Sequence, residues 1–233
     1  MNLRATPSEH FHRRIAAKLA DFSITVFGVA DLNGIATLPD QTGRSFLRAV
    51  SFARRMDPAV MAGIKGGPNQ TYADEYARAN DNIDAAAAAL VSEIQELGFE
   101  ARTFSASQRT DPIHIRGEFP HKTAATRAGI GWIGRNCLLI TRNYGPWVRL
   151  GTVFTHLPLD VAQPLTKNHC GKCTQCVEAC PAGALLGNRW KPGIQRNEIM
   201  DAAACDRWKK EHYYRFHQGH NCGICAAVCP FGR

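Results

Sequence analysis

Two cysteine runs constrain this sequence more than any other feature. The first reads Cys170-Gly-Lys-Cys173-Thr-Gln-Cys176-Val-Glu-Ala-Cys180-Pro181, and its C-x2-C-x2-C-x3-C-P spacing is that of bacterial iron–sulfur ferredoxins. The second reads Cys222-Gly-Ile-Cys225-Ala-Ala-Val-Cys229-Pro230 and is one cysteine short, which Cys205 upstream can supply. We therefore expect the segment to fold around iron–sulfur clusters and only when they are bound.

Eight of the nine cysteines can be assigned to two clusters, because only Cys137 lies far from the others in sequence. In two-cluster ferredoxins the fourth cysteine of each run ligates the cluster of the other run. The sequence therefore predicts two 4Fe–4S clusters, one held by Cys170, Cys173, Cys176 and Cys229 and the other by Cys180, Cys205, Cys222 and Cys225.

Other uses of the cysteines fit less well. Two zinc sites would also use eight thiolates, but zinc motifs rarely have this spacing. Disulfides are disfavoured by the odd count and by the lack of a secretory signal. Cys137 is expected to be a small buried apolar residue.

Length and composition predict one domain of ordinary size followed by a small one, with bounds of 1–160 and 161–233. No stretch is long and apolar enough to span a membrane, so we expect no membrane association. Metal-ligating thiols favour the reducing cytoplasm. The formal charge of +8 falls to roughly +4 once the thiolates and cluster cores are counted, which does not by itself indicate nucleic acid.

Hydrophobic periodicity predicts both helices and strands before the cysteines. Apolar residues at helical spacing predict helices over 8–20 and 72–97. Runs of branched and aromatic residues predict strands over 24–29, 48–53 and 99–104. Two further strands, over 138–141 and 148–155, are expected to form a hairpin.

The most polar loop precedes the most glycine-rich stretch. Residues 105–123 contain many titratable groups, and Ala128–Asn136 reads Ala-Gly-Ile-Gly-Trp-Ile-Gly-Arg-Asn. Glycines alternating with bulky residues indicate a backbone that closely approaches a flat or bulky group, although tight turn packing also explains them.

The segment Arg207–His217 interleaves basic and aromatic residues. Such interleaving is typical of surfaces that bind single-stranded nucleic acid. It is equally typical of a short helix whose aromatic side chains shield a cluster while its charges face water, and we favour this second interpretation.

Taken together, His121–Ile140, Leu150–Thr155 and the two cysteine runs make the sequence resemble the epoxyqueuosine reductase family. The resemblance covers most of the chain and is strongest from residue 121 to 230. It implies a nitroreductase-like, cobalamin-binding α+β domain, of the kind shared with reductive dehalogenases, followed by a small bacterial ferredoxin-like two-cluster domain.

The resemblance also implies a function. Electrons from a donor such as a ferredoxin or flavodoxin would pass through the clusters to cobalamin, which would reduce the epoxide of a modified tRNA base. Asp111 is the implied proton donor, with Glu118 and His121 as alternatives. The residues implied to line the cobalamin pocket are Gly129, Gly131, Trp132, Gly134, Arg135 and Asn136.

Three departures from the family pattern leave alternatives open. The chain is shorter than typical members, Asp111 matches only after a register shift, and the segment after Cys205 differs. These departures are compatible with a short paralogue acting on another substrate. They are also compatible with a ferredoxin-like electron-transfer protein, or a corrinoid-reducing partner, that has no catalytic site of its own.

Overall fold

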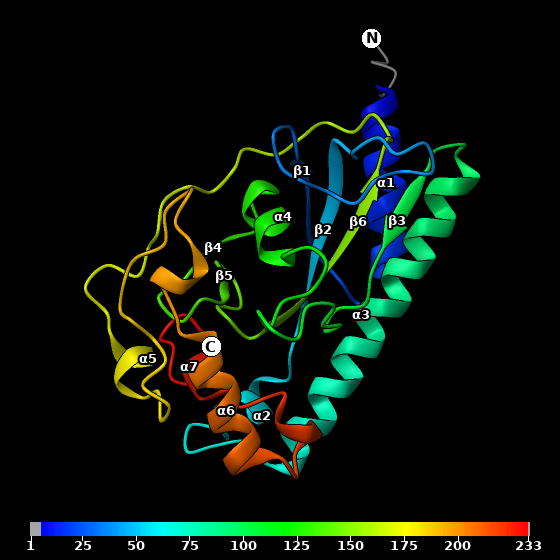
Figure 1. Cartoon of the computed structure of the whole chain (residues 1–233). Helices are drawn as coiled ribbons and strands as arrows, with labels where there is room; N and C mark the ends of the chain where they lie inside the picture. The colour runs from blue at the N-terminus through cyan, green and yellow to red at the C-terminus, as the bar shows by residue number, and fades with distance from the viewer. Residues whose placement is uncertain (1–5, 233) are drawn as a thin grey trace.

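The computed structural model describes residues 6–232, and its centre is a four-stranded antiparallel sheet (Figure 1). The strand order is β1-β2-β6-β3, with bounds β1 (Val26–Asp31), β2 (Arg48–Arg55), β6 (Val148–Thr155) and β3 (Ala101–Thr103). The strands predicted from branched and aromatic runs are confirmed to within about two residues at most ends. Both faces of the sheet are buried, since Phe52 and Ala53 on β2 join different apolar clusters.

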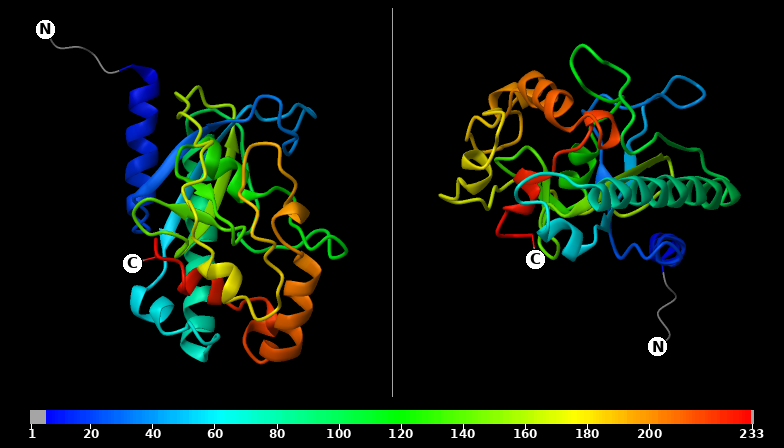
Figure 2. Two further views of the ribbon diagram at one scale, coloured as in Figure 1. Left: turned by 90° about the vertical axis from the view of Figure 1, so that its left-hand side faces the viewer. Right: turned by 90° about the horizontal axis from the view of Figure 1, so that it is seen from below.

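Helices α1 (Pro7–Ala20) and α3 (Gln70–Glu96) cover one face of the sheet, as Figures 1 and 2 show. Their apolar side chains pack against the strands in one hydrophobic cluster. Within it, the Phe52 ring lies directly against the backbone of Gly151, which has no side chain. A Cβ at Gly151 would lie 2.3 Å from the ring of Phe52. Helix α3 begins where the Asn69 side chain accepts a hydrogen bond from the Tyr72 backbone N–H at 2.9 Å. Both predicted helices are therefore confirmed.

Helix α4 (His121–Arg127) packs on the opposite face of the sheet. Its small residues allow a close approach, and a Cβ at Gly28 would lie 2.2 Å from the carbonyl oxygen of Ala128. The position of α4 matters because its first residues, His121 and Lys122, line the cavities described below.

The predicted hairpin is wrong. Strand β5 (Leu139–Thr141) pairs with β4 (Gly131–Ile133) in a separate two-stranded sheet. Strand β6 is hydrogen-bonded to β2 on one side and to β3 on the other, so it has no free edge for β5. The glycine-rich stretch instead supplies β4 as the partner of β5, because Gly131 allows the two strands to approach closely. A Cβ at Gly131 would lie 2.3 Å from the carbonyl oxygen of Ile140.

The cysteine segment wraps around the end of the molecule next to α2 (Pro58–Ala62) and the start of α3 (Figure 1). It contains short helices and turns, with bounds α5 (Gln175–Glu178), η1 (Arg196–Glu198), α6 (Ala202–Tyr213), η2 (His217–Gly219) and α7 (Ile224–Ala227). Helix α7 is tied to the preceding part by the Trp147 Nε1–H, which donates to the carbonyl of Ala226 at 2.9 Å. The boundary after residue 160 stays a prediction.

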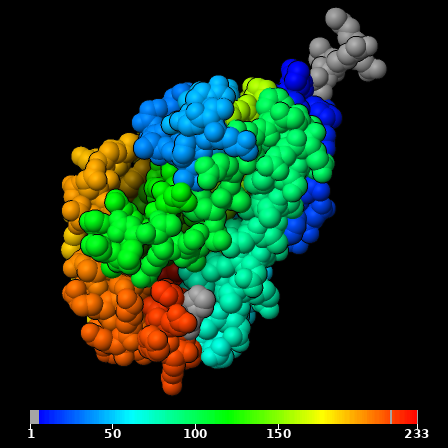
Figure 3. All heavy atoms as spheres, turned by 45° about the vertical axis from the view of Figure 1, so that its right-hand side comes forward, coloured from blue at the N-terminus to red at the C-terminus, as the bar shows by residue number. Residues whose placement is uncertain are grey.

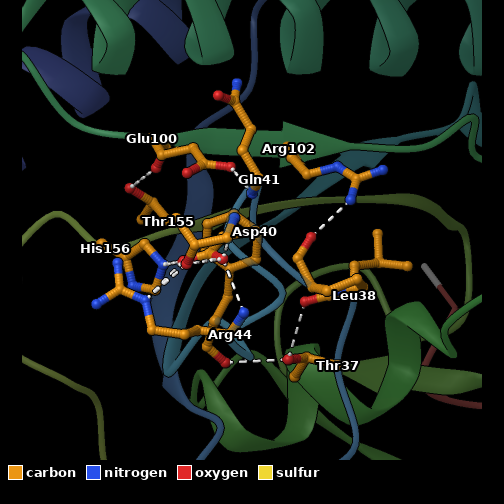
Figure 4. A network of polar contacts seen from close by, with 12 residues as sticks. Thr37, Leu38, Asp40, Gln41, Arg44, Glu100, Arg102, Thr155 and His156 are labelled. Atoms are coloured by element: carbon orange, nitrogen blue, oxygen red, sulfur yellow. Dashed lines mark hydrogen bonds and ion pairs between the residues drawn. The ribbon is translucent and has the colours of Figure 1, made fainter.

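A polar network anchors the loop between β1 and β2 (Figure 4). The buried Asp40 carboxylate accepts hydrogen bonds from the backbone of Thr42 and Arg44, and the His156 ring lies 3.0 Å away. Burial alone would raise the pKa of Asp40, but these hydrogen bonds outweigh it and hold the pKa well below its usual range. The Asp40 carboxylate uses both of its oxygens to hold its own loop and His156, so we assign the network a structural role.

Within residues 6–232, none of the helices has the length and apolar character needed to cross a membrane.

Candidate metal centres and the adjoining cavity

The structure brings the eight predicted ligands together in two separate groups. Set A lines a small cavity and comprises Cys170, Cys173, Cys176 and Cys229. Set B lines a larger cavity of about 170 Å³ and comprises Cys180, Cys205, Cys222 and Cys225. All of them are free thiols.

Two short helices divide the cysteines between the sets. Cys176 lies in α5 and Cys180 follows its end, while Cys225 lies in α7 and Cys229 follows its end. In each pair, the first cysteine lies within the short helix and the second lies just past its end, four residues later. The two members of a pair line different cavities, so each run contributes to both. Helix α6 supplies the remaining ligand of set B, Cys205, and it begins with the Asp201 side chain accepting from the backbone of Ala204.

Burial raises the pKa of several of these thiols, which makes them harder to ionise without a metal. Burial, together with neighbouring Cys229 and Cys170, raises the pKa of Cys176 to about 11. Burial also raises the pKa of Cys225 beyond the usual range for a thiol, and the other set-B cysteines add to the shift. Four thiolates so close together need a cation, which the iron atoms of a cluster supply.

The thiol arrangement suits a polynuclear group better than zinc. A structural zinc ion needs four sulfur or nitrogen ligands at about 2.0–2.3 Å from one point. Among the described residues, no group of three or more His, Cys, Asp or Glu side chains is arranged to hold a single metal ion. The two sets instead surround cavities, as ligands of a cubane would.

A third cavity, of about 290 Å³, lies beside set B and opens to solvent. Lys122 and Leu138 line both cavities, so the two cavities share part of a wall. The walls of this acceptor cavity combine aromatic, aliphatic and basic side chains, chiefly Phe104, Phe119, Leu139, Arg109, Arg116 and Arg149. In Figure 3 the green surface that includes the loop 105–118 lies between the blue surface of the segment that joins β1 and β2 and the orange surface of α6.

His121 is held in the wall of the acceptor cavity. Its ring stacks on Phe104 with centroids 4.5 Å apart, and its Nδ1 lies 2.9 Å from Thr152 Oγ1. Its Nε2 is buried and has no hydrogen-bond partner in the described chain. Burial, with a smaller contribution from Arg149, lowers the pKa of His121 to about 3, so the ring is neutral at physiological pH.

The acceptor cavity carries uncompensated positive charge. The Arg149 guanidinium donates to Asn80 Oδ1 at 2.8 Å and Ser107 Oγ at 2.6 Å, and lies 4.3 Å from the centre of the Tyr76 ring. These partners are all neutral. Arg109 differs, since its charge is paired with Asp206 at 2.7 Å. The arrangement favours a ligand that presents negative charge or hydrogen-bond acceptors to Arg149.

Asp111, the predicted proton donor, does not line the acceptor cavity. Its carboxylate accepts from the His114 backbone at 2.9 Å and from Arg116 Nε at 2.8 Å, and the His114 ring lies 2.8 Å away. The hydrogen bonds from His114, and then that from Arg116, hold the pKa of Asp111 well below its usual range. In this conformation Asp111 is ionised and has no proton to donate. Its catalytic role stays a prediction.

The six residues predicted to line a cobalamin pocket are placed elsewhere. None of them lines the acceptor cavity. Arg135 and Asn136 line the set-A cavity, and Asn136 also lines the set-B cavity. Gly131 and Gly134 are close to Ile140, and Trp132 packs against Phe231. Contacts within the protein account for these glycines, and the cobalamin role of the stretch stays a prediction.

Helix α6 explains the basic aromatic segment. Trp208 lines the set-B cavity, whereas Arg207 and Lys210 are exposed. The favoured interpretation, aromatic shielding of the second cluster, agrees with this placement. Sequence reasoning missed Arg149, because an arginine within a strand gives no sign of the cavity that it will face.

Comparison with known proteins supports the cluster assignment. Residues 169–232 match the family model described as a 4Fe-4S double cluster binding domain. The epoxyqueuosine reductase of Listeria monocytogenes is 39% identical over 124 residues, covering 50% of this chain and 31% of that protein. The epoxyqueuosine reductase of Aliivibrio fischeri is 29% identical over 216 residues, covering 84% and 52%. The chain thus spans about half the length, or less, of these curated relatives.

Solved structures share the fold. A catabolic reductive dehalogenase in complex with 3-bromo-4-hydroxybenzoic acid matches with a TM-score of 0.78 at 20% identity, covering 98% of this chain and 32% of that one. A Bacillus subtilis epoxyqueuosine reductase whose catalytic aspartate loop is swung out of the active site matches with a TM-score of 0.59, also at 20% identity, covering 98% and 66%. The chain therefore combines an α+β fold resembling these proteins with a C-terminal double-cluster domain, and its sequence is similar to part of the epoxyqueuosine reductases.

Proposed function

We propose that this protein is an iron–sulfur reductase that passes single electrons from the set-A cluster through the set-B cluster to a group bound in the acceptor cavity. The observation that carries the proposal is the shared wall of Lys122 and Leu138 between the set-B and acceptor cavities. A group bound in the acceptor cavity would therefore lie next to the set-B cluster, with Lys122 and Leu138 between them. Set A, farther from the acceptor cavity, would receive electrons from a ferredoxin or flavodoxin.

Cobalamin is the proposed occupant of the acceptor cavity, and a nitroreductase-like, cobalamin-binding α+β domain is the corresponding proposal for the fold. The apolar walls suit the face of a corrin ring, and the basic side chains and the unpartnered His121 Nε2 suit its amide and phosphate edges. A cavity of about 290 Å³ encloses only part of such a group, so the remainder would extend through the opening. When bound, cobalamin would supply a metal centre that can be reduced to a strong nucleophile.

The residues of this chain would orient the bound groups and supply a proton. Arg149 and Lys122 would hold negative charge, and neutral His121 would hold a hydrogen-bonding group at Nε2. Asp111 would act only after its loop moves, because loss of the His114 and Arg116 contacts removes what keeps its pKa low. The swung-out aspartate loop of the Bacillus subtilis relative supports such a movement.

The proposed substrate is the epoxyqueuosine of a tRNA, in keeping with the named activity of the relatives. Exposed Arg207 and Lys210 on α6, and Tyr214 with 65% of its surface exposed, suit contact with an RNA backbone and bases. The second candidate is an electron-transfer protein without its own catalytic site. The ionised state of Asp111 favours that alternative.

The test is anaerobic reconstitution with iron, sulfide and cobalamin, followed by gel filtration and single-turnover assay on epoxyqueuosine-containing tRNA. We expect cluster and corrinoid absorption to co-elute, and mass spectrometry to detect queuosine. Arg149→Met should reduce corrinoid retention without changing the iron content, whereas Arg207→Met should leave corrinoid retention unchanged. Full cluster loading without any corrinoid retention would favour the electron-transfer candidate.

A further inference from the structure

Each cluster cavity has in its wall a buried N–H group for which the described residues provide no acceptor. Among the described side chains, few buried nitrogen or oxygen atoms lack a partner. The Nε of Arg135 is one, and Arg135 lines the set-A cavity. The Nε1 of Trp208 is another, and Trp208 lines the set-B cavity. Trp132 and Asn221 also have unpartnered atoms, but neither lines a cluster cavity.

Trp208 is held in a fixed position next to a ligand of set B. It lies three residues after Cys205 on α6, so the two side chains share one face of the helix. Its ring stacks on His212 at a centroid distance of 3.7 Å and an angle of 10°. Elsewhere, Trp147 satisfies its Nε1–H by donating to the carbonyl of Ala226. A buried indole N–H normally has a partner, so its lack at Trp208 needs an explanation.

Arg135 is held equally firmly at set A. Its terminal nitrogens donate to the carbonyl oxygens of Gly171, within the first cysteine run, and of Gly187, a few residues after it. These two contacts fix the guanidinium group and leave Nε–H as the donor without an acceptor. Burying a donor without an acceptor destabilises the folded protein, so an acceptor is expected in the filled cavity.

We propose that the Trp208 Nε1–H and the Arg135 Nε–H donate hydrogen bonds to sulfur atoms of the set-B and set-A clusters, and thereby raise their reduction potentials. Reduction adds negative charge to a cluster, and a hydrogen bond to sulfur stabilises that charge more strongly in the reduced state. The inference rests on the two clusters of the proposed function but needs neither cobalamin nor a substrate. It makes Trp208 and Arg135 positioning residues that set potentials.

The test is a redox titration of the reconstituted protein without cobalamin, followed by electron paramagnetic resonance. Trp208→Phe keeps the aromatic ring but removes the N–H, and we expect the set-B potential to fall while set A is unchanged. A tenfold weaker reduction equilibrium would correspond to about 59 mV for one electron. Arg135→Lys keeps the charge but removes the Nε–H, and should lower only the set-A potential. Cys176→Ser, which removes a set-A ligand, identifies the two signals.

The matched control is His212→Leu, which removes the ring stacked on Trp208 but leaves its N–H in place, and should leave both potentials unchanged. Should Trp208→Phe fail to bind its cluster, the wild-type protein labelled with ¹⁵N-tryptophan decides the question. A magnetic coupling between ¹⁵N and the reduced set-B cluster is expected. Full clusters with unshifted potentials, or no such coupling, would overturn the inference. Failure to assemble clusters would instead contradict the proposed function.

Discussion

The two cysteine sets have the same number of ligands but are built in different ways. Three ligands of set A fall within Cys170–Cys176, so their position depends mainly on local turns and α5. Set B draws its ligands from three places: Cys180 just after α5, Cys205 in α6, and Cys222 and Cys225 at the start of α7. Set B also adjoins the acceptor cavity, whereas set A does not. The centre that depends most on long-range packing is thus the one placed to deliver electrons.

The largest effect is expected from removing one ligand of each set. Cys225→Ala should leave about four irons per chain and prevent electron transfer to any group in the acceptor cavity. Cys173→Ala should also leave about four irons, but set B should still accept electrons from dithionite. Iron analysis and stopped-flow reduction measure both outcomes. Equal loss of electron transfer in the two variants would show that set B is not the sole cluster that delivers electrons to the acceptor cavity.

A second prediction concerns the two-stranded sheet of β4 and β5, which lies beside set A. Gly131→Ala places a Cβ 2.3 Å from the carbonyl oxygen of Ile140, so β4 and β5 must separate. We expect a loss of about 2–3 kcal/mol in unfolding free energy, measured by urea denaturation, and preferential loss of the set-A cluster. Gly66→Ala is the control, since nothing lies within 4 Å of its added Cβ. Preferential loss of set B would contradict the assignment.

The stability of the set-B site should depend instead on Asp206. This buried carboxylate joins α6 to the cavity loop through Arg109 at 2.7 Å and also contacts Lys210 at 2.9 Å. Burial would raise the pKa of Asp206, but these two partners outweigh it and hold the pKa well below its usual range. Its stabilising contribution is present at neutral pH and is lost as pH falls through the folded-state pKa.

Asp206→Asn should therefore cost about 2–3 kcal/mol at pH 7, with a smaller cost in acid, and should release iron from set B before set A. Asp21→Asn, at an exposed residue 4.0 Å from Lys18, should change stability by less than about 0.5 kcal/mol. The prediction fails if Asp206→Asn shows the same cost at every pH.

The smallest effect is expected for His121. Its pKa falls from 6.5 to about 3 on folding, so below pH 6.5 the unfolded chain binds a proton that the folded chain does not. Stability is thus lost as pH falls toward 3. Relative to His121→Gln, the wild-type protein should lose about 1–2 kcal/mol between pH 7.5 and 5.5. Parallel pH profiles of the two proteins in urea would contradict burial of a neutral ring.

The features predictable from sequence were those set by local spacing. The cysteine runs predicted the two sets, and the apolar stripe of α3 predicted the longest helix, because each pattern depends on near neighbours. The partner of β5 was not predictable, since it depends on the edges of β6 that distant strands leave free. The acceptor cavity was missed for the same reason. It combines α4, β6 and a loop that meet only in the folded chain.

Asn136 has a consequence for the rate of electron exchange between the two clusters. It lines both cluster cavities, its Nδ2 donates to the carbonyl of Cys225, and its Oδ1 accepts from the backbone of Leu138. Both ends of this buried amide are thus held by hydrogen bonds, which fixes its orientation between the two cavities. Electron transfer between the two clusters should then cross a fixed protein medium, and its rate should not depend on solvent viscosity.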